Sequence, residues 1–131
     1  MKKSVKEMVQ AANARIETLS IEDALSLLGA DDVQFVDIRD VRELERDGVI
    51  PGAMHAPRGM LEFWVDPESP YHREAFASGK KMIFFCAAGW RSALATDTVR
   101  SMGLKNICHI DGGFGAWRDA GGPIEPKAHK S

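Results

Sequence analysis

Cysteine is scarce in this sequence: its 131 residues include two, Cys86 and Cys108. There is no C-x-x-C pair and no group of cysteines and histidines at the spacing of zinc ligands, so we predict no structural zinc and no metal site. In a reducing compartment two isolated cysteines are typically thiols rather than a disulfide. Any chemistry at these positions is therefore expected to be that of free thiols.

Long apolar runs and an excess of charge are also lacking. The longest apolar candidates, such as residues 82–88, are far shorter than the roughly 20 residues that cross a bilayer, and no apolar signal region follows the charged N-terminus. The 17 basic and 19 acidic side chains leave a net charge of -2, which gives no reason to expect nucleic acid or an anionic membrane as a partner. We therefore predict a cytoplasmic protein.

The length and the hydrophobic content of 44% fit one domain with its own core. Residues 1–15 are polar, with apolar residues at helical spacing, and predict a peripheral N-terminal helix. Residues 123–131 are predicted to form a C-terminal tail, which follows two glycines and begins with a proline. The predicted domain lies between them, at residues 16–122.

Strand and helix patterns alternate along this domain. Short apolar or β-branched runs predict strands at 16–19, 33–38, 54–56, 82–86 and 107–110. Helical spacing predicts helices at 21–28, 41–46, 91–102 and 114–120, while residues 57–80 mix helix fragments with turns. Such alternation is typical of an α/β fold in which helices cover both faces of a parallel sheet.

The most informative segment follows the apolar strand at 82–86. The predicted site consists of Cys86, Ala87, Ala88, Gly89, Trp90 and Arg91. Small residues let the backbone turn tightly from strand to helix, so that several N–H groups converge at the carboxyl end of a strand, where α/β proteins bind ligands. With the permanent charge of Arg91, this environment favours the thiolate. A lone cysteine here is otherwise a small buried hydrophobe, but the Cys-x-x-Gly-x-Arg spacing favours a nucleophile.

Taken together, several segments resemble a single-domain rhodanese, a sulfurtransferase, over residues 16–122. The matching segments are Asp37-Ile38-Arg39 with Glu43, Gly48-x-Ile50-Pro51-Gly52-Ala53, the loop from Cys86 to Arg91, and Asp111-Gly112-Gly113 with Trp117. The resemblance implies a three-layer α/β/α domain with a five-stranded, mostly parallel sheet.

The resemblance also implies a two-step reaction. The Cys86 thiolate takes a sulfur from a donor such as thiosulfate, holds it as a persulfide, and passes it to cyanide or a thiol. No metal or organic cofactor is implied. The expected partners are small sulfur donors and acceptors, and a protein persulfide is compatible as well.

Two other functions remain open. Phosphatases of the cell-cycle-control type and similar arsenate reductases have five residues between cysteine and arginine, whereas four separate Cys86 from Arg91 here, which favours sulfur over a tetrahedral oxyanion. Non-catalytic rhodanese-like binding modules often lack the cysteine, and its presence with Gly89 and Arg91 argues against that class.

Several residues besides Cys86 are candidates for supporting roles. Asp37 and Arg39 resemble the strand-end pair of the family: we expect an ion pair for Arg39 and, for Asp37, hydrogen bonds from backbone near the cysteine loop. Arg58 either lies on the surface or binds an anionic donor. Trp90 either shields the persulfide or packs against the sheet edge. Cys108 is interpreted as a buried strand thiol, with a resolving thiol as the alternative.

The four histidines do not cluster at ligand spacing, and we assign none of them to a metal. They are His55, His72, His109 and His129. His55 and His109 lie near the ends of predicted strands, where contact with the site is conceivable.

Overall fold

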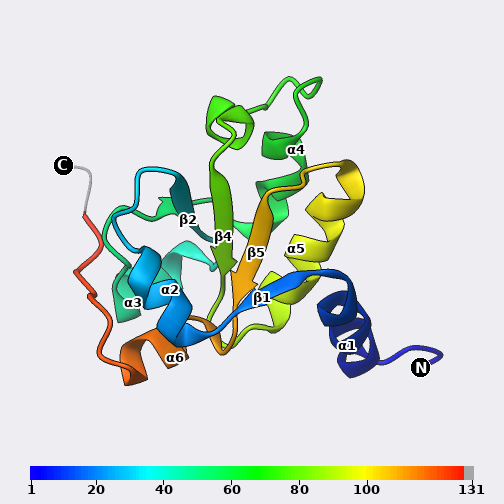
Figure 1. Ribbon diagram of the computed structural model, residues 1–131. Helices are drawn as coiled ribbons and strands as arrows, with labels where there is room; N and C mark the ends of the chain where they lie inside the picture. The colour runs from blue at the N-terminus through cyan, green and yellow to red at the C-terminus, as the bar shows by residue number, and fades with distance from the viewer. Residues whose placement is uncertain (129–131) are drawn as a thin grey trace.

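The computed structural model describes residues 1–128, with a central sheet of five parallel strands in the order β1-β5-β4-β2-β3 (Figure 1). The strands are β1 Glu17–Leu19, β2 Val33–Asp37, β3 Met54–His55, β4 Lys81–Phe85 and β5 Ile107–Ile110. This confirms the predicted five-stranded α/β fold. An isolated antiparallel bridge joins Val49 to Glu125 outside the sheet.

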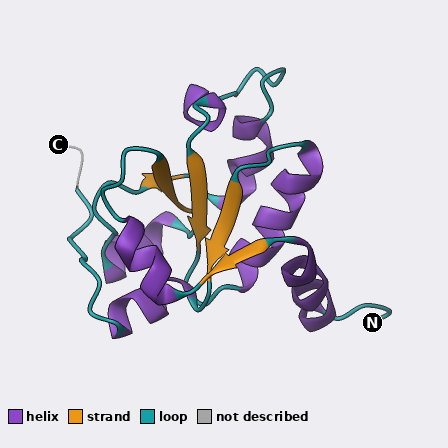
Figure 2. Cartoon of the chain, viewed as in Figure 1, coloured by secondary structure: helices purple, strands orange, loops and turns teal. Residues whose placement is uncertain are grey.

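Helices cover both faces of the sheet (Figure 2). The α-helices are α1 Val5–Arg15, α2 Ile21–Leu27, α3 Val41–Asp47, α4 Leu61–Val65, α5 Trp90–Met102 and α6 Gly113–Asp119, and two 3-10 helices are η1 Arg58–Met60 and η2 Glu74–Ala77. The apolar residues of α4 and α5 pack on one face, and those of α2 and α6 pack on the other. Among the described residues, no helix is long and apolar enough to cross a membrane.

The apolar run of β4 is continuous because both faces of this strand are covered. Met82 and Phe84 pack with α4 and α5, whereas Ile83 and Phe85 pack with α2 and α6. Successive side chains of a strand point to opposite faces, so a strand with helices on both sides needs apolar residues at every position. Cys86 continues the first series, and its side chain lies on the α5 face.

The N-terminal helix α1 lies against α5 (Figure 1). Val9 and Ala12 are buried with Ala93 of α5. At the last residue of α1, Arg15 forms a bidentate ion pair with Asp97 of α5, with N–O distances of 2.9 and 2.6 Å. The peripheral helix predicted for residues 1–15 is therefore held on the domain by both apolar and charged contacts.

The segment after α6 folds back over the domain. The indole N–H of Trp117 donates to the carbonyl of Pro123 at 2.9 Å, and Glu125 forms the bridge to Val49. Of the tail predicted at 123–131, residues 129–131, including His129, lie outside the described residues.

Candidate active site

Cys86 lies directly after β4, and backbone N–H groups surround its sulfur. Sγ accepts hydrogen bonds from the N–H of Gly89 at 3.1 Å and from the N–H of Ser92 at 3.4 Å. The Ser92 hydroxyl lies 3.5 Å from Sγ. Because Cys86 is only 1% exposed, these groups replace water as the polar surroundings of the sulfur. Such donors stabilise negative charge on sulfur, whether of a thiolate or of a persulfide.

A left-handed glycine makes this arrangement possible. Gly89 has a φ of 104° and is the N-cap of α5, so the chain turns from β4 into the helix within a few residues. A residue with a Cβ rarely adopts this backbone conformation. The turn aims the N–H groups of Gly89 and Ser92 at one point, as the spacing in the sequence predicted.

Helix α6 holds the same loop from the other side. The N–H of Phe114 donates to the carbonyl of Cys86 at 2.8 Å, and the N–H of Gly115 donates to the carbonyl of Ala87 at 3.0 Å. Gly113, with a φ of 60°, lies so close that an added Cβ would collide with the Cys86 carbonyl oxygen. The loop carbonyls thus face α6, which leaves loop N–H groups free to face the sulfur.

Arg91 binds a carboxylate as well as lying near the cysteine. Its guanidinium donates to both oxygens of Glu43 on α3, at 2.8 and 2.9 Å. This hydrogen bonding lowers the pKa of Glu43 to about 2, and it raises the pKa of Arg91, to which Cys86 adds smaller effects in the same direction. The permanent charge of Arg91 thus lies near Cys86 as expected, and the sequence did not indicate that Glu43 pairs with it.

Asp37 and Arg39 form a buried ion pair at 2.8 Å. The guanidinium of Arg39 also donates to the carbonyl of Gly48 and lies 4.0 Å from the centre of the Phe114 ring. The backbone group that Asp37 accepts from is the N–H of Arg39, not one near the cysteine loop, which corrects the expectation for Asp37. Through Phe114 at the start of α6, this pair supports the helix that holds the loop.

Arg58 and Trp90 are more exposed. The guanidinium of Arg58 pairs with Glu62 at 2.7 Å, one turn further along the chain, so it is bonded within its own segment. The Trp90 side chain, on the first residue of α5, is 50% exposed. Half of the indole surface is therefore open to contact with an incoming molecule four residues after Cys86.

Ser92 contacts Sγ of Cys86 and was not predicted to do so, whereas His109 was named as a residue within reach of the site and contacts Ser92. His109 lies on β5, and its Nδ1 is 2.9 Å from the Ser92 hydroxyl. Its Nε2 lies 2.9 Å from Oδ1 of Asn13 on α1. Burial lowers the pKa of His109, and the charge of Asp111 opposes this in part. The position of His109 near a predicted strand end indicated the site, but it did not identify Ser92 and Asn13 as the partners of the imidazole.

Cys108 is separated from Cys86 by the sheet. It packs with the α2 and α6 side, while Cys86 packs with the α5 side. Burial raises the pKa of the Cys108 thiol to about 12, so it is a protonated thiol at neutral pH. These observations favour the buried strand thiol over a resolving thiol.

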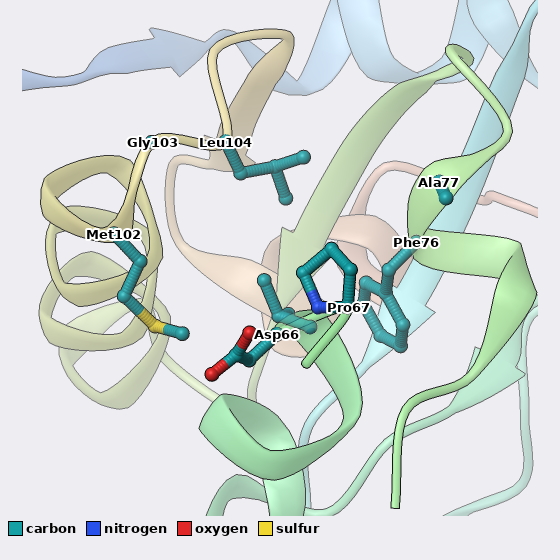
Figure 3. Close-up of a pocket in the computed structure, with 8 residues that line it drawn as sticks. Asp66, Pro67, Phe76, Ala77, Met102, Gly103 and Leu104 are labelled. Carbon is teal, nitrogen blue, oxygen red and sulfur yellow. The ribbon is translucent and has the colours of Figure 1, made fainter. Parts of the chain in front are cut away.

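A cavity of about 470 Å³ is lined by residues that do not include the cysteine loop (Figure 3). It lies between the end of α4, η2 and the end of α5, whereas Cys86 precedes the start of α5. Its lining residues are Val65, Asp66, Pro67, Phe76, Ala77, Met102, Gly103 and Leu104. Within residues 1–128, no three His, Cys, Asp or Glu side chains gather in a way that could hold a metal ion.

Known proteins share this arrangement of sequence and fold. Residues 20–120 match the model of the rhodanese-like domain family. The chain is 28% identical over 120 residues to mouse thiosulfate sulfurtransferase/rhodanese-like domain-containing protein 3, covering 88% of this chain and 76% of the mouse protein. The polysulfide-sulfur transferase of Wolinella succinogenes superimposes with a TM-score of 0.70 at 32% identity, over 95% of this chain and 88% of that one. A protein of unknown function from Rhodopseudomonas palustris, named a possible tyrosine phosphatase, superimposes with a TM-score of 0.93 at 58% identity, over 95% and 96% of the two chains.

Proposed function

Because this chain belongs to the rhodanese-like domain family, we propose that it is a sulfurtransferase that carries a sulfane sulfur on Cys86. The observation that carries this proposal is the pair of backbone N–H groups, from Gly89 and Ser92, that bind Sγ in a buried loop. Cysteine acts as a nucleophile in its thiolate form, and these donors favour that form.

The proposed reaction with thiosulfate proceeds in two displacements. The Cys86 thiolate attacks the outer sulfur, a new S–S bond forms, and the bond to the sulfonate sulfur breaks, with its electron pair leaving on sulfite. The product is a persulfide anion whose outer sulfur lies about 2 Å beyond Sγ. Cyanide or a thiolate then attacks that sulfur, and the Cys86 thiolate is restored. The chain's own groups suffice for this chemistry, so we propose no metal or organic cofactor.

The loop around the sulfur supports the remaining assignments. We propose that Ala87, Ala88 and Gly89 form the cradle, that Arg91 holds it to α3 through Glu43, and that Trp90 offers a surface to the acceptor. Asp37 and Arg39 act as a scaffold beneath α6. Arg58 has a carboxylate partner of its own, which argues against a leading role in donor binding.

The donor is proposed from chemistry and from the relatives. Thiosulfate, a low-molecular-weight persulfide and a protein persulfide all present an outer sulfur to a thiolate, and the name of the Wolinella succinogenes relative adds polysulfide to the candidates. A small donor fits a nucleophile that is 1% exposed better than a bulky one, because it enters the loop without moving it.

A cysteine-dependent phosphatase is the second candidate, favoured by the name of the Rhodopseudomonas palustris relative. Against it stands the loop, in which four residues separate Cys86 from Arg91. In addition, the Arg91 guanidinium is bound to both oxygens of Glu43 and is not free to bind a phosphoryl group without releasing that carboxylate.

Intact-mass analysis after treatment with thiosulfate tests the proposal. We expect a gain of one sulfur atom that is lost on addition of cyanide, is absent in Cys86→Ser, and persists in the control Cys108→Ser. No gain in mass with any of the four donor classes, together with hydrolysis of an aryl phosphate that depends on Cys86, would establish the phosphatase instead.

A further inference from the structure

A continuous hydrogen-bonded series of side chains runs from the buried cysteine to the surface. Sγ of Cys86 lies 3.5 Å from Oγ of Ser92, which lies 2.9 Å from Nδ1 of His109. Nε2 of His109 lies 2.9 Å from Oδ1 of Asn13. Cys86, Ser92 and His109 are buried, whereas Asn13 is exposed on α1. The series therefore joins four residues from three elements and the active-site loop.

With Oδ1 of Asn13 facing the imidazole, one tautomer of His109 satisfies every hydrogen bond of the series. Its Oδ1 can only accept, so Nε2 of His109 carries a proton and donates it. In a neutral imidazole the other nitrogen, Nδ1, is then an acceptor, and it accepts the hydroxyl proton of Ser92. The oxygen of Ser92 remains free to accept from the thiol of Cys86, which is the direction that the geometry supports.

We infer that His109 receives the proton of Cys86 through Ser92 when the thiol becomes a nucleophile, and that Asn13 holds the imidazole in the accepting form. This inference rests on the proposed sulfur transfer by Cys86, since it names the groups that activate the same site. His109 and Asn13 act through Ser92 and do not touch the reacting sulfur, so they are positioning residues.

The proton movements balance without another reactant. The S–H bond of Cys86 breaks and its proton binds Oγ of Ser92, while the original hydroxyl proton of Ser92 moves to Nδ1 of His109. The result is a thiolate, a neutral serine and an imidazolium, and nothing is oxidised or reduced. Nε2 of His109 keeps its proton and its bond to Asn13 in both states, so Asn13 does not have to turn.

The surroundings of His109 fit an imidazole that is neutral before the reaction. β4 and β1 flank it through Phe84 and Thr18 in the sheet, and α5 and α1 contact it through Ser92 and Asn13. Charged residues of these elements form ion pairs, namely Arg15 with Asp97, Arg100 with Asp97, Lys81 with Glu17 and Arg91 with Glu43. Lys6 and Glu7 lie about two turns before Asn13 on α1, and Cys108 faces the other side of the sheet. Burial lowers the pKa of His109, and the charge of Asp111, just after β5, opposes that effect.

The series also assigns a role to α1. Asn13 lies outside residues 20–120, which match the family, yet it supplies the last hydrogen bond. The ion pair of Arg15 with Asp97 and the packing of Val9 and Ala12 on α5 hold Asn13 at this place. Helix α1 is therefore part of the site and not an appendage to the domain.

The test is the rate at which iodoacetamide alkylates Cys86 in the full chain, measured by peptide mass as a function of pH. For His109→Gln, which keeps hydrogen-bonding groups but does not titrate, we expect a rate about 10²-fold below the native rate at about pH 6. At high pH, hydroxide in solution deprotonates a thiol without help from a protein base, so the two rates should converge to within about twofold. Ser92→Ala should behave like His109→Gln, Ser92→Thr should restore the native profile, and the control His72→Gln should match the native chain.

An exposed position gives a second, independent readout. In Asn13→Asp, a carboxylate beside the imidazole raises the pKa of His109, so the rate should fall off at a higher pH than in the native chain. The nitrogen NMR signals of native His109 should show the proton on Nε2. A rate loss in His109→Gln that is equal at every pH, or a native tautomer with its proton on Nδ1, would overturn the inference.

Alkylation needs no sulfur donor, so the two proposals can fail separately. A pH-dependent gap without persulfide formation from any of the four donor classes leaves the proton path in place and removes the sulfurtransferase. Persulfide formation without such a gap retains the sulfurtransferase and removes the proton path.

Discussion

Gly113→Ala is expected to destabilise the protein and displace the cysteine loop. Gly113 has a φ of 60°, and a Cβ there would collide with the carbonyl oxygen of Cys86 and come within 3.0 Å of the backbone of Ala87. The left-handed conformation costs an alanine about 1–2 kcal/mol. Forcing backbone atoms apart adds about 1–3 kcal/mol, since no flexible side chain can move away.

Gly29→Ala is the matched control. Gly29 has a φ of 86°, but an added Cβ would meet nothing within 4 Å, so only the conformational cost of about 1–2 kcal/mol applies. The free energy of unfolding from urea denaturation measures both losses, and the difference between them isolates the collision with the loop.

The same variants also report on the site. Because Gly113 precedes the N–H groups that bind the loop carbonyls, Gly113→Ala should slow alkylation of Cys86 in the folded protein, while Gly29→Ala should leave it unchanged. Equal losses of stability in both variants, with equal reactivity of Cys86, would refute the argument that α6 positions the loop.

Three further predictions concern the charged pairs and the exposed indole. Asp37→Asn leaves the buried guanidinium of Arg39 without its ion-pair partner and should lower the free energy of unfolding by about 3–5 kcal/mol, measured in urea; a loss below about 1 kcal/mol would contradict its scaffold role. The pKa of Glu43 is lowered from 4.5 to about 2, so its stabilising contribution is present above about pH 4.5 and is lost as the pH falls towards 2. Glu43→Gln should therefore reduce the fall in unfolding free energy across that range, and an unchanged slope would mean that Arg91 does not hold Glu43 in solution. Trp90→Ala should change stability by less than about 0.5 kcal/mol, because the side chain is 50% exposed, yet raise the KM for a thiol acceptor; unaltered kinetics would remove Trp90 from the site.

Much of the fold could be predicted because it depends on local patterns. The apolar run of β4 indicated a strand covered on both faces, and Met82, Ile83, Phe84 and Phe85 are divided between those faces. Ser20 before α2 caps that helix by accepting from the N–H of Asp23, a contact between residues three positions apart. The small residues after Cys86 indicated a tight turn, and Gly89 makes it with a positive φ.

Pairings between distant segments could not be predicted in the same way. The sequence placed Arg91 in the cysteine loop but could not show that its guanidinium binds Glu43, which lies 48 positions away. Asp37 was expected to bond to the cysteine loop, yet it bonds to its neighbour Arg39, whose guanidinium reaches Gly48. A charged side chain pairs with a group that folding brings close to it, and local sequence patterns do not predict which distant groups come close.

Local patterns were enough to predict that a cysteine ends a buried strand and begins a loop of converging N–H groups, because strand periodicity and glycine conformation are local properties. The side chains that surround this cysteine could be identified only from the tertiary structure. His109 and Asn13 are 96 positions apart, and His109 contacts both Ser92 and Asn13 because β5 and α1 each pack against α5. A cysteine at a strand end can thus be located from its own segment, whereas the side chains around it depend on how distant segments pack.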